Sequence, residues 1–301
     1  MTTSPVTDAN EPTGPAARTP AAEPVGAETA TRRRAPWPLG LVVGGGIVAI
    51  VVLVAILAPL IAPADPNAQD LTGILLPPGP GHLLGTDSLG RDIASRIIHG
   101  ARFELGLVLP PLLVTVLVAL PLGMAAGYVG RWVDKVVSAI SDTLLTFPSL
   151  VAAIVLVALL GNGTVPLMVT LVVTQLPAMV RYVRGFAKQV SSSQYVLAAR
   201  SSGSSTPTIL RVHVLGNILG QVLVIASLFA SEAILVIAAL GFLGVGVQPP
   251  NAEWGTMLSE GRIDFMNAPH VMIAPGAAIA LLILGFNLLG DGLRDRLDTR
   301  G

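Results

Sequence analysis

The chain has 301 residues, of which 52% are hydrophobic and only 12% are charged. Soluble domains carry about twice that share of charged residues, so this composition predicts an integral membrane protein. The formal net charge is zero and cysteine is absent, so nothing points to a nucleic-acid partner, and disulfides and thiolate metal sites are excluded.

The N-terminal segment, residues 1–36, is rich in Ala, Thr, Pro and Glu and lacks periodicity, which predicts a disordered tail. Residues 39–62 follow as an apolar block that is long enough to cross a bilayer. A signal peptide has its basic residues at the start of the chain and only a short apolar core. We therefore interpret the block as a retained first transmembrane helix.

Five further apolar blocks of spanning length lie at residues 105–128, 136–160, 165–183, 218–243 and 271–289. Because the bilayer core offers no hydrogen-bond partners, each block is expected to be helical. The sequence therefore predicts an all-α integral membrane protein with six transmembrane helices. Kinks are expected at prolines within these blocks, namely Pro110, Pro111, Pro121, Pro148 and Pro177.

The distribution of Lys and Arg predicts the orientation of the helices. With the N-terminus placed in the cytoplasm, the cytoplasmic segments hold 14 of the 18 basic residues, and the C-terminus is cytoplasmic too. Four parts are expected: a disordered cytoplasmic tail at 1–36, a first helix and outer loop at 37–103, a five-helix core at 104–290 and a cytoplasmic tail at 291–301.

Two long outer loops contain apolar residues that a simple connection does not need. In the first loop, Ile93, Ile97 and Ile98 lie on one face of a predicted short amphipathic helix. The second loop is predicted to be ordered and to dip partly into the membrane, because it contains Trp254, Met257, Leu258 and Phe265. The alternative is that Trp254 is only an interfacial anchor.

The polar stretch at 193–216 predicts two short cytoplasmic helices joined by a bend. Ser193 is suited to cap the first helix, and Gly203 is suited to end it in the left-handed conformation. Thr206 and Pro207 are suited to start the second helix.

One face of the first short helix carries mainly small side chains, from Tyr195, Ala198, Ala199 and Ser202. Such a face allows the backbone of another protein to approach closely. The alternative is an ordinary surface loop that contains two helical turns.

Two acidic residues, Asp142 and Glu232, lie inside the predicted spans. An ionisable residue within a membrane helix marks a functional site by default. Asp142 lies near the cytoplasmic end of its span, whereas Glu232 lies near mid-span and is the candidate for a translocation path. No second intramembrane charge of opposite sign is expected beside them, so an ion relay has little support.

No catalytic site, cofactor or metal site is expected. The phosphate-binding loop G-x-x-x-x-G-K-[ST] is absent, because neither Lys135 nor Lys188 has the required neighbours. No Ser/His/Asp set and no paired carboxylates lie at a comparable membrane depth. The four histidines are far apart in the chain: His82, His99, His213 and His270.

Three stretches carry a family resemblance: LGTDSLGRDIASRIIHGAR at 84–102, LGFLGVGVQPPNAEWGTML at 240–258 and GDGLRDRLDTR at 290–300. Together they resemble the permease subunits of bacterial ABC importers for dipeptides, oligopeptides and nickel, specifically the second of their two membrane subunits. The resemblance covers residues 37–299.

The stretch at 193–216 resembles a motif of ABC importers, Glu-Ala-Ala, three residues, Gly, nine residues, Ile-x-Leu-Pro. The chain matches it at Ala198, Ala199, Gly203 and Leu215 and departs from it at Leu197, His213 and Gly216. The resemblance implies that the bent helix pair is a coupling helix, which docks on a separate ATPase subunit. The residues assigned to that contact are Tyr195, Leu197, Ala198, Ala199, Gly203 and Leu215.

The resemblance also implies a type I ABC importer permease fold, surrounded by lipid in the bacterial inner membrane. The implied partners are a second permease subunit that completes a heterodimer, two ABC ATPase subunits and an extracytoplasmic solute-binding protein. The implied contacts with the binding protein are Gln248, Pro249, Pro250, Trp254 and Gly255. Di- or oligopeptides are the implied solute. Nickel or another small solute is the alternative, and a secondary transporter is a more distant one.

Overall fold

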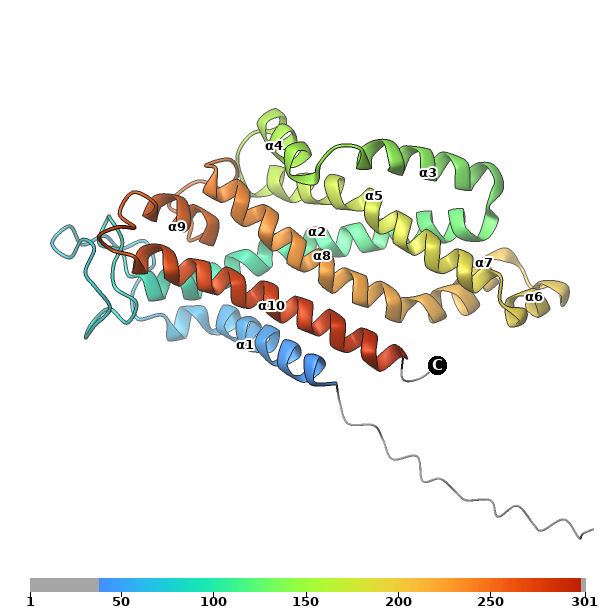
Figure 1. Ribbon diagram of the computed structural model, residues 1–301, viewed down its shortest axis with the longest axis horizontal. Coiled ribbons are helices and arrows are strands. Elements are labelled where there is room, and N and C mark those ends of the chain that lie inside the picture. Colours follow the sequence, from blue (N-terminus) through green and yellow to red (C-terminus); the bar gives the residue numbers. More distant parts are fainter. Residues whose placement is uncertain (1–37, 299–301) are drawn as a thin grey trace, which may run out of the picture. The chain divides into compact units, whose positions relative to one another are not determined.

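The computed structural model describes residues 38–298. The predicted disordered tail at 1–36 and the last residues of the C-terminal tail lie outside the described residues. The elements are α1 (Leu39–Ile61), α2 (Ile93–Val129), α3 (Arg131–Leu145), α4 (Ser149–Leu160), α5 (Thr164–Ser191), α6 (Gln194–Ser201), α7 (Thr206–Thr208), the π-helix η1 (Ile209–Leu215), α8 (Gly216–Phe242), α9 (Trp254–Gly261) and α10 (His270–Asp298) (Figure 1).

The fold consists of helices, and residues 38–298 contain no β-strand. Five helices are long and apolar enough to cross a membrane: α1, α2, α5, the continuous stretch from α7 to α8, and α10. The pair α3 and α4 raises the number to six if it counts as one span. The prediction of an all-α membrane protein is confirmed.

The block at 136–160 differs from the prediction of one kinked span. It forms two helices, α3 and α4, whose axes are bent by 85° at the break between Leu145 and Ser149. Pro148 lies in that break; proline has no N–H to donate, and it disfavours helical backbone in the residue before it. The other four prolines at which kinks were expected lie inside continuous helices: Pro110, Pro111 and Pro121 in α2, and Pro177 in α5.

The predicted short amphipathic helix is also not separate, because Ile93, Ile97 and Ile98 form the first turns of the 37-residue helix α2. Asp92 caps this helix, since its carboxylate accepts a hydrogen bond from the Ser95 N–H at 2.7 Å. The cap lies well before the apolar block at 105–128. Helix α2 therefore extends beyond the apolar span at its N-terminal end.

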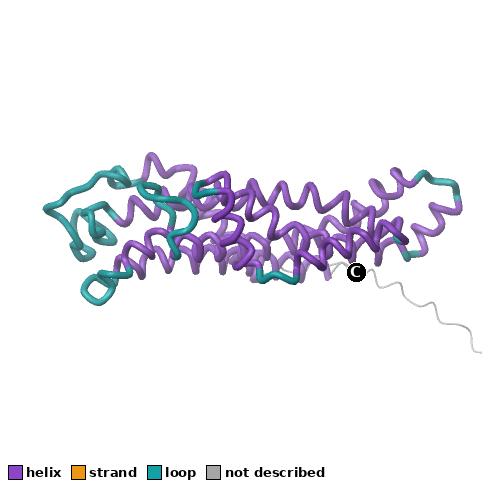
Figure 2. The backbone as a smooth tube through the Cα atoms, turned by 90° about the horizontal axis from the view of Figure 1, so that it is seen from above, coloured by secondary structure: helices purple, strands orange, loops and turns teal. Residues whose placement is uncertain are grey.

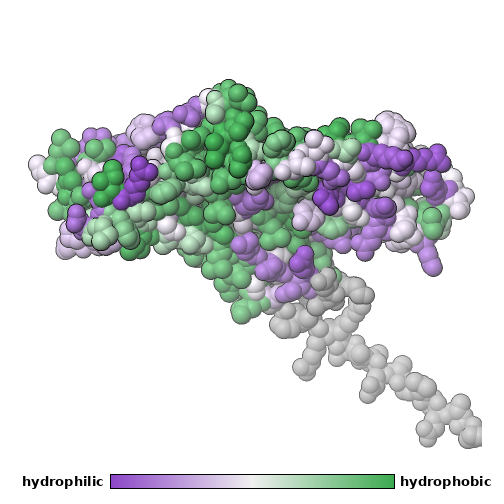
Figure 3. Space-filling model, turned by 45° about the horizontal axis from the view of Figure 1, so that its top comes forward, coloured by the Kyte–Doolittle hydropathy of each residue, from purple (hydrophilic) through white to green (hydrophobic). Residues whose placement is uncertain are grey.

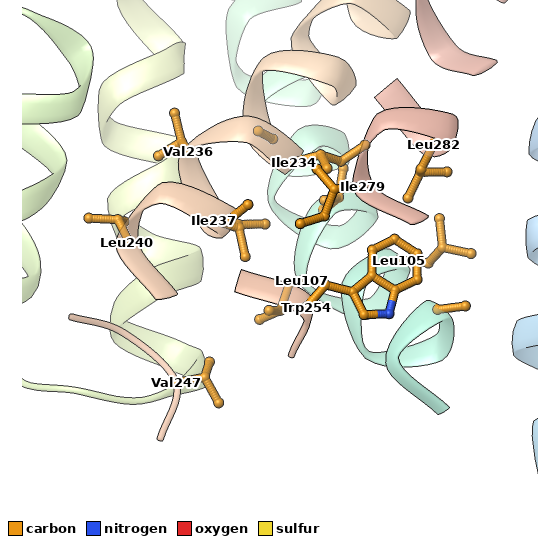
Figure 4. Close-up of a cluster of buried hydrophobic side chains, with 14 of the residues drawn as sticks. Leu105, Leu107, Ile234, Val236, Ile237, Leu240, Val247, Trp254, Ile279 and Leu282 are labelled. Atoms are coloured by element: carbon orange, nitrogen blue, oxygen red, sulfur yellow. The ribbon is translucent and has the colours of Figure 1, made fainter. Parts of the chain in front are cut away.

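The long helices pack into two hydrophobic clusters. One cluster joins α1, α2, α8, α9 and α10 with α4 and the start of α5, and it includes Leu105, Ile234 and Trp254 (Figure 4). The other joins α2, α5, α6, η1 and α8 and includes Val183 and Ile218. Apolar side chains cover the middle of the surface in Figure 3, as expected for helices in contact with lipid.

The loops gather at the two ends of the helices (Figure 2). The loop at 62–92 and helix α9 lie at one end, here called the α9 end, and α6 and α7 lie at the other, here called the α6 end. Hydrophilic side chains gather at the α6 end in Figure 3. The two predicted contact surfaces therefore lie on opposite sides of the apolar region.

Candidate functional site

At the α6 end, the short helix α6 ends as predicted. Gly203 has φ of +81°, a left-handed conformation that costs glycine little. The Ser204 N–H donates to the Ala199 carbonyl and the Gly203 N–H to the Arg200 carbonyl, each at 3.1 Å. This pair of hydrogen bonds is a Schellman motif, and it turns the chain sharply away from α6.

Two details of this stretch differ from the prediction. Ser193 occupies the N-cap position, but its hydroxyl donates to the Val190 carbonyl at 2.6 Å and does not cap α6. The second helix has Ser205 at its N-cap, with Thr206 already inside the helix. It is also not a separate short helix, because α7 continues through η1 into α8. The α7 stretch is thus continuous with a helix that is long and apolar enough to cross a membrane.

The exposed face of α6 is opposite the buried Val196. Tyr195 and Leu197 are 46% and 50% exposed, Ala198 and Gly203 are exposed, and Ala199 is half-buried. The structure thus brings these five predicted coupling residues to one small surface. The sixth, Leu215, lies in η1 and is half-buried.

Two side-chain contacts hold α6 in place. The Tyr195 ring lies 6.4 Å from the His213 ring of η1, centroid to centroid. The Arg200 guanidinium lies 5.8 Å from the centroid of Tyr128 near the end of α2. Because η1 continues into α8 and α2 is itself long enough to span a membrane, α6 is joined to the bundle by side-chain contacts as well as by the backbone.

The two acidic residues of the spans differ in their surroundings. Asp142 forms an ion pair with Arg181 of α5 at 3.6 Å, and the neighbouring Asp134 pairs with Arg184. The expectation that no opposite charge accompanies Asp142 was therefore wrong. Glu232 is exposed on α8 and has no partner among residues 38–298.

At the α9 end, an ion-pair network joins the loop at 62–92 to the end of α9. Arg91 and Arg96 are 2% and 0% exposed. Their guanidinium groups donate to the Glu260 carboxylate at 2.7 and 3.3 Å, and Arg91 also donates to Asp87 at 2.6 Å. Sequence reasoning missed these residues, although Asp87, Arg91 and Arg96 all lie in the stretch that carries the family resemblance.

Trp254, at the start of α9, lies inside the protein. Its side chain is 2% exposed, and its Nε1–H donates to the Ile97 carbonyl at 3.3 Å. Figure 4 shows the indole among apolar side chains of α2, α8 and α10. Trp254 is therefore not an interfacial anchor, which the sequence left open.

The predicted contact residues at this end fall into two groups. Gln248, Pro249 and Pro250 are exposed, whereas Trp254 and Gly255 are buried. Only the first group can touch a partner in this conformation. Beside it lies a hollow of about 410 Å³, whose lining includes His99, Arg102, Phe103, Thr164, Asn251 and Ala252.

Known proteins resemble the chain over most of its length. A family described as binding-protein-dependent transport system inner membrane component matches residues 119–300, and one described as the N-terminal TM domain of oligopeptide transport permease C matches residues 40–78. The chain is 40% identical over 260 residues to the glutathione transport system permease protein GsiD of Pectobacterium atrosepticum, covering 86% of both chains.

Two further relatives are similar to the same degree. The dipeptide transport system permease protein DppC of Alkalihalophilus pseudofirmus is 39% identical over 259 residues, which cover 86% of this chain and 85% of that one. The probable D,D-dipeptide transport system permease protein DdpC of Escherichia coli is 39% identical over 254 residues, covering 84% and 85%.

Proposed function

The chain belongs to the family of binding-protein-dependent transport system inner membrane components, and on that basis we propose that it forms half of the path by which an ABC importer carries di- or oligopeptides into the cell. As a member, it is a non-catalytic, multi-pass permease subunit with the type I ABC permease fold, and it works with ATPase and solute-binding partners.

Peptides are the favoured solutes because the relatives named above transport dipeptides and glutathione, which are short peptides. One permease subunit supplies only part of a path, so the complex is proposed to contain a second permease subunit and two ATPase subunits. Glu232, exposed at mid-span on α8, is the candidate residue for the path, because a carboxylate is strongly disfavoured against lipid.

The observation that carries the coupling role is the small-residue surface of α6. Its exposed Ala198 and Gly203 permit close approach, while the Schellman motif and the contacts of Tyr195 and Arg200 fix its position. A rigid surface of this kind can be moved by an ATPase as one body. Because α7 continues into α8, that movement would reach the proposed path.

At the opposite end, we assign contact with the solute-binding protein to Gln248, Pro249 and Pro250. Trp254 and Gly255 are assigned a supporting role, since both are buried. The N- and C-termini and α6 are then cytoplasmic, and the α9 end faces outward. The excess of Lys and Arg near the α6 end supports this orientation.

Co-purification tests the proposed function. A tagged chain extracted in mild detergent is expected to bring down an ATPase subunit and a second permease subunit, and the reconstituted complex is expected to take up peptides only when ATP and the binding protein are supplied. Transport by the chain without ATP, or extraction without any ATPase, would contradict the importer assignment.

The orientation has its own prediction. An alkaline phosphatase reporter fused after Gly161, which ends α4, is expected to be active, because this enzyme folds only outside the cytoplasm. The same reporter fused at Ser204, between α6 and α7, is expected to be silent. The measurement is phosphatase activity per amount of fusion protein, and the reverse pattern would overturn the orientation.

A further inference from the structure

The start of α9 lies in a slot between α2 and α8. A Cβ added at Gly100 of α2 would collide with the Trp254 indole, and a Cβ added at Gly241 of α8 would collide with the Glu253 carboxylate. Both glycines therefore create the room that α9 occupies. The exposed segment Gln248 to Pro250 immediately precedes this slot, so its position depends on how α9 is seated.

Two carboxyl groups meet in the slot, although no such pair was expected from the sequence. Glu104 of α2 and Glu253, the N-cap of α9, are each 1% exposed, and they are neighbours in space because Glu104 binds the N–H of Trp254, the residue that follows Glu253. Glu104 Oε1 accepts a hydrogen bond from the Trp254 N–H at 3.0 Å. Glu104 Oε2 is buried and has no partner.

The hydrogen-bond partners distinguish the two groups. Glu253 Oε1 accepts from the Gly255 N–H at 2.6 Å, and Oε2 accepts from the N–H and the hydroxyl of Thr256 at 2.6 Å each. A carboxylate satisfied entirely by donors is the ionised member of the pair. Glu104 receives one donor only, so its free oxygen is satisfied if it carries a proton and donates it.

We propose that Glu104 is a neutral carboxylic acid that donates its Oε2 proton to Glu253, and that this shared proton holds α9 in the slot between α2 and α8. Loss of the proton would leave two adjacent negative charges in a buried site, which is strongly unfavourable. Glu104 and Glu253 are thus positioning residues for the surface that precedes α9.

The pair has no compensating cation within the described part of the chain, where Glu253 is the charged group that acts on Glu104. The other titratable groups of the surrounding elements bind elsewhere or line the hollow and the surface: Arg91, Arg96, Glu260, His270, His99, Arg102 and Glu232. Protonation is therefore the means by which this site stays neutral enough to be buried.

The dependence on pH follows from the same burial. Burial raises the pKa of Glu253, although the hydrogen bonds from Thr256 and Gly255 act in the opposite direction. A carboxyl pair whose proton is bound more tightly when α9 is seated favours the seated state at acidic and neutral pH. As the pH rises far enough to remove the shared proton from Glu104, that contribution is lost and α9 is released.

Amide substitutions separate the two roles. Glu104→Gln keeps an acceptor for the Trp254 N–H and a donor for Glu253, so uptake at neutral pH is expected to stay within about twofold of wild type. Glu253→Gln sets an NH₂ group against the donors of Gly255 or Thr256, so uptake is expected to fall about tenfold or more. Equal effects of the two amides would overturn the proposal.

Whether α9 occupies the slot between α2 and α8 can be measured without a transport assay. In the purified full chain, Trp37→Phe and Trp132→Phe leave Trp254 as the single tryptophan. In the single-tryptophan chain that retains Glu104, acrylamide quenching of the Trp254 fluorescence is expected to increase from neutral to alkaline pH. In the same chain with Glu104→Gln, quenching is expected to stay low. The same profile in both, or no increase before circular dichroism reports unfolding, would contradict the shared proton.

An infrared difference spectrum tests the proton itself. The carbonyl band of a protonated carboxylic acid is expected at neutral pH in wild type and is expected to be missing from Glu104→Gln, and its absence from wild type would overturn the proposal. The uptake measurement rests on the proposed function, whereas the fluorescence and infrared measurements do not. Failure of wild-type uptake with the expected spectra would therefore count against the function alone.

Discussion

Peptide uptake by the assembled complex is expected to fall at least about tenfold when Ala199 is replaced by Glu or Gly203 by Asp, while ATP hydrolysis continues. The new carboxylate would be buried at the contact with the ATPase without a partner, and contact residues of this kind are worth about 2 kcal/mol or more. A Cβ at Gly203 meets no atom within 4 Å, so the added side chain collides only with a partner.

Among the residues that could replace Gly203, Asp is one of those that the backbone tolerates best. The φ of +81° is strained for most residues, but Asp and Asn tolerate the left-handed region better than others. The chain itself is therefore expected to reach the membrane at its normal level. Uptake and ATPase activity should be measured together in proteoliposomes, since their ratio reports coupling.

Ala68→Glu is the matched control for Ala199→Glu, because it makes the same change at an exposed position in the loop at 62–92. It is expected to leave the ratio of uptake to ATP hydrolysis unchanged. Wild-type coupling in Ala199→Glu and Gly203→Asp, at normal amounts of protein, would show that this face of α6 is not the docking surface.

Gly44→Val is expected to separate α1 from α10 and to destabilise the folded chain by about 1–3 kcal/mol. A Cβ at Gly44 would collide with the backbone of α10 at Leu288 and Leu289, and a Cβ at Gly292 of α10 would collide with the backbone of Leu41. Small residues allow two membrane helices to approach this closely, and dispersion contacts along that seam hold them together.

Gly46→Val is the control for this substitution, since it adds the same side chain on the same helix where no atom lies within 4 Å of the new Cβ. The measurement is the amount of folded protein recovered in detergent and its midpoint of thermal unfolding. Equal losses from both substitutions would mean that helix propensity, and not the contact between α1 and α10, limits stability.

The spans could be predicted from the sequence because a bilayer sets a simple requirement. About 20 consecutive apolar residues are needed to cross it, and each backbone group must be satisfied within a helix. The position of Gly203 was also predictable, because a left-handed turn at a helix end selects glycine through local sterics alone.

The wrong predictions concern features that local patterns leave undecided. Ser193 was suited to cap α6, but its hydroxyl bonds back to Val190 at the end of α5. A kink was predicted at Pro148, but the sequence did not reveal that the bend reaches 85° and divides the block at 136–160 into α3 and α4. Ser193 could cap α6 or bond back to α5, and Pro148 could kink one helix or separate two. The local sequence allowed both outcomes in each case, and the packing of neighbouring helices selected one.

The sequence by itself determined the membrane class, the helical architecture and the family, because apolar length and short motifs are local properties of the chain. Only the tertiary structure decided that Arg91 and Arg96 bind Glu260, that Trp254 is buried, and that Glu104 meets Glu253. These partners are far apart in the chain, and no periodicity encodes a contact that forms only after α2, α8 and α9 have packed together.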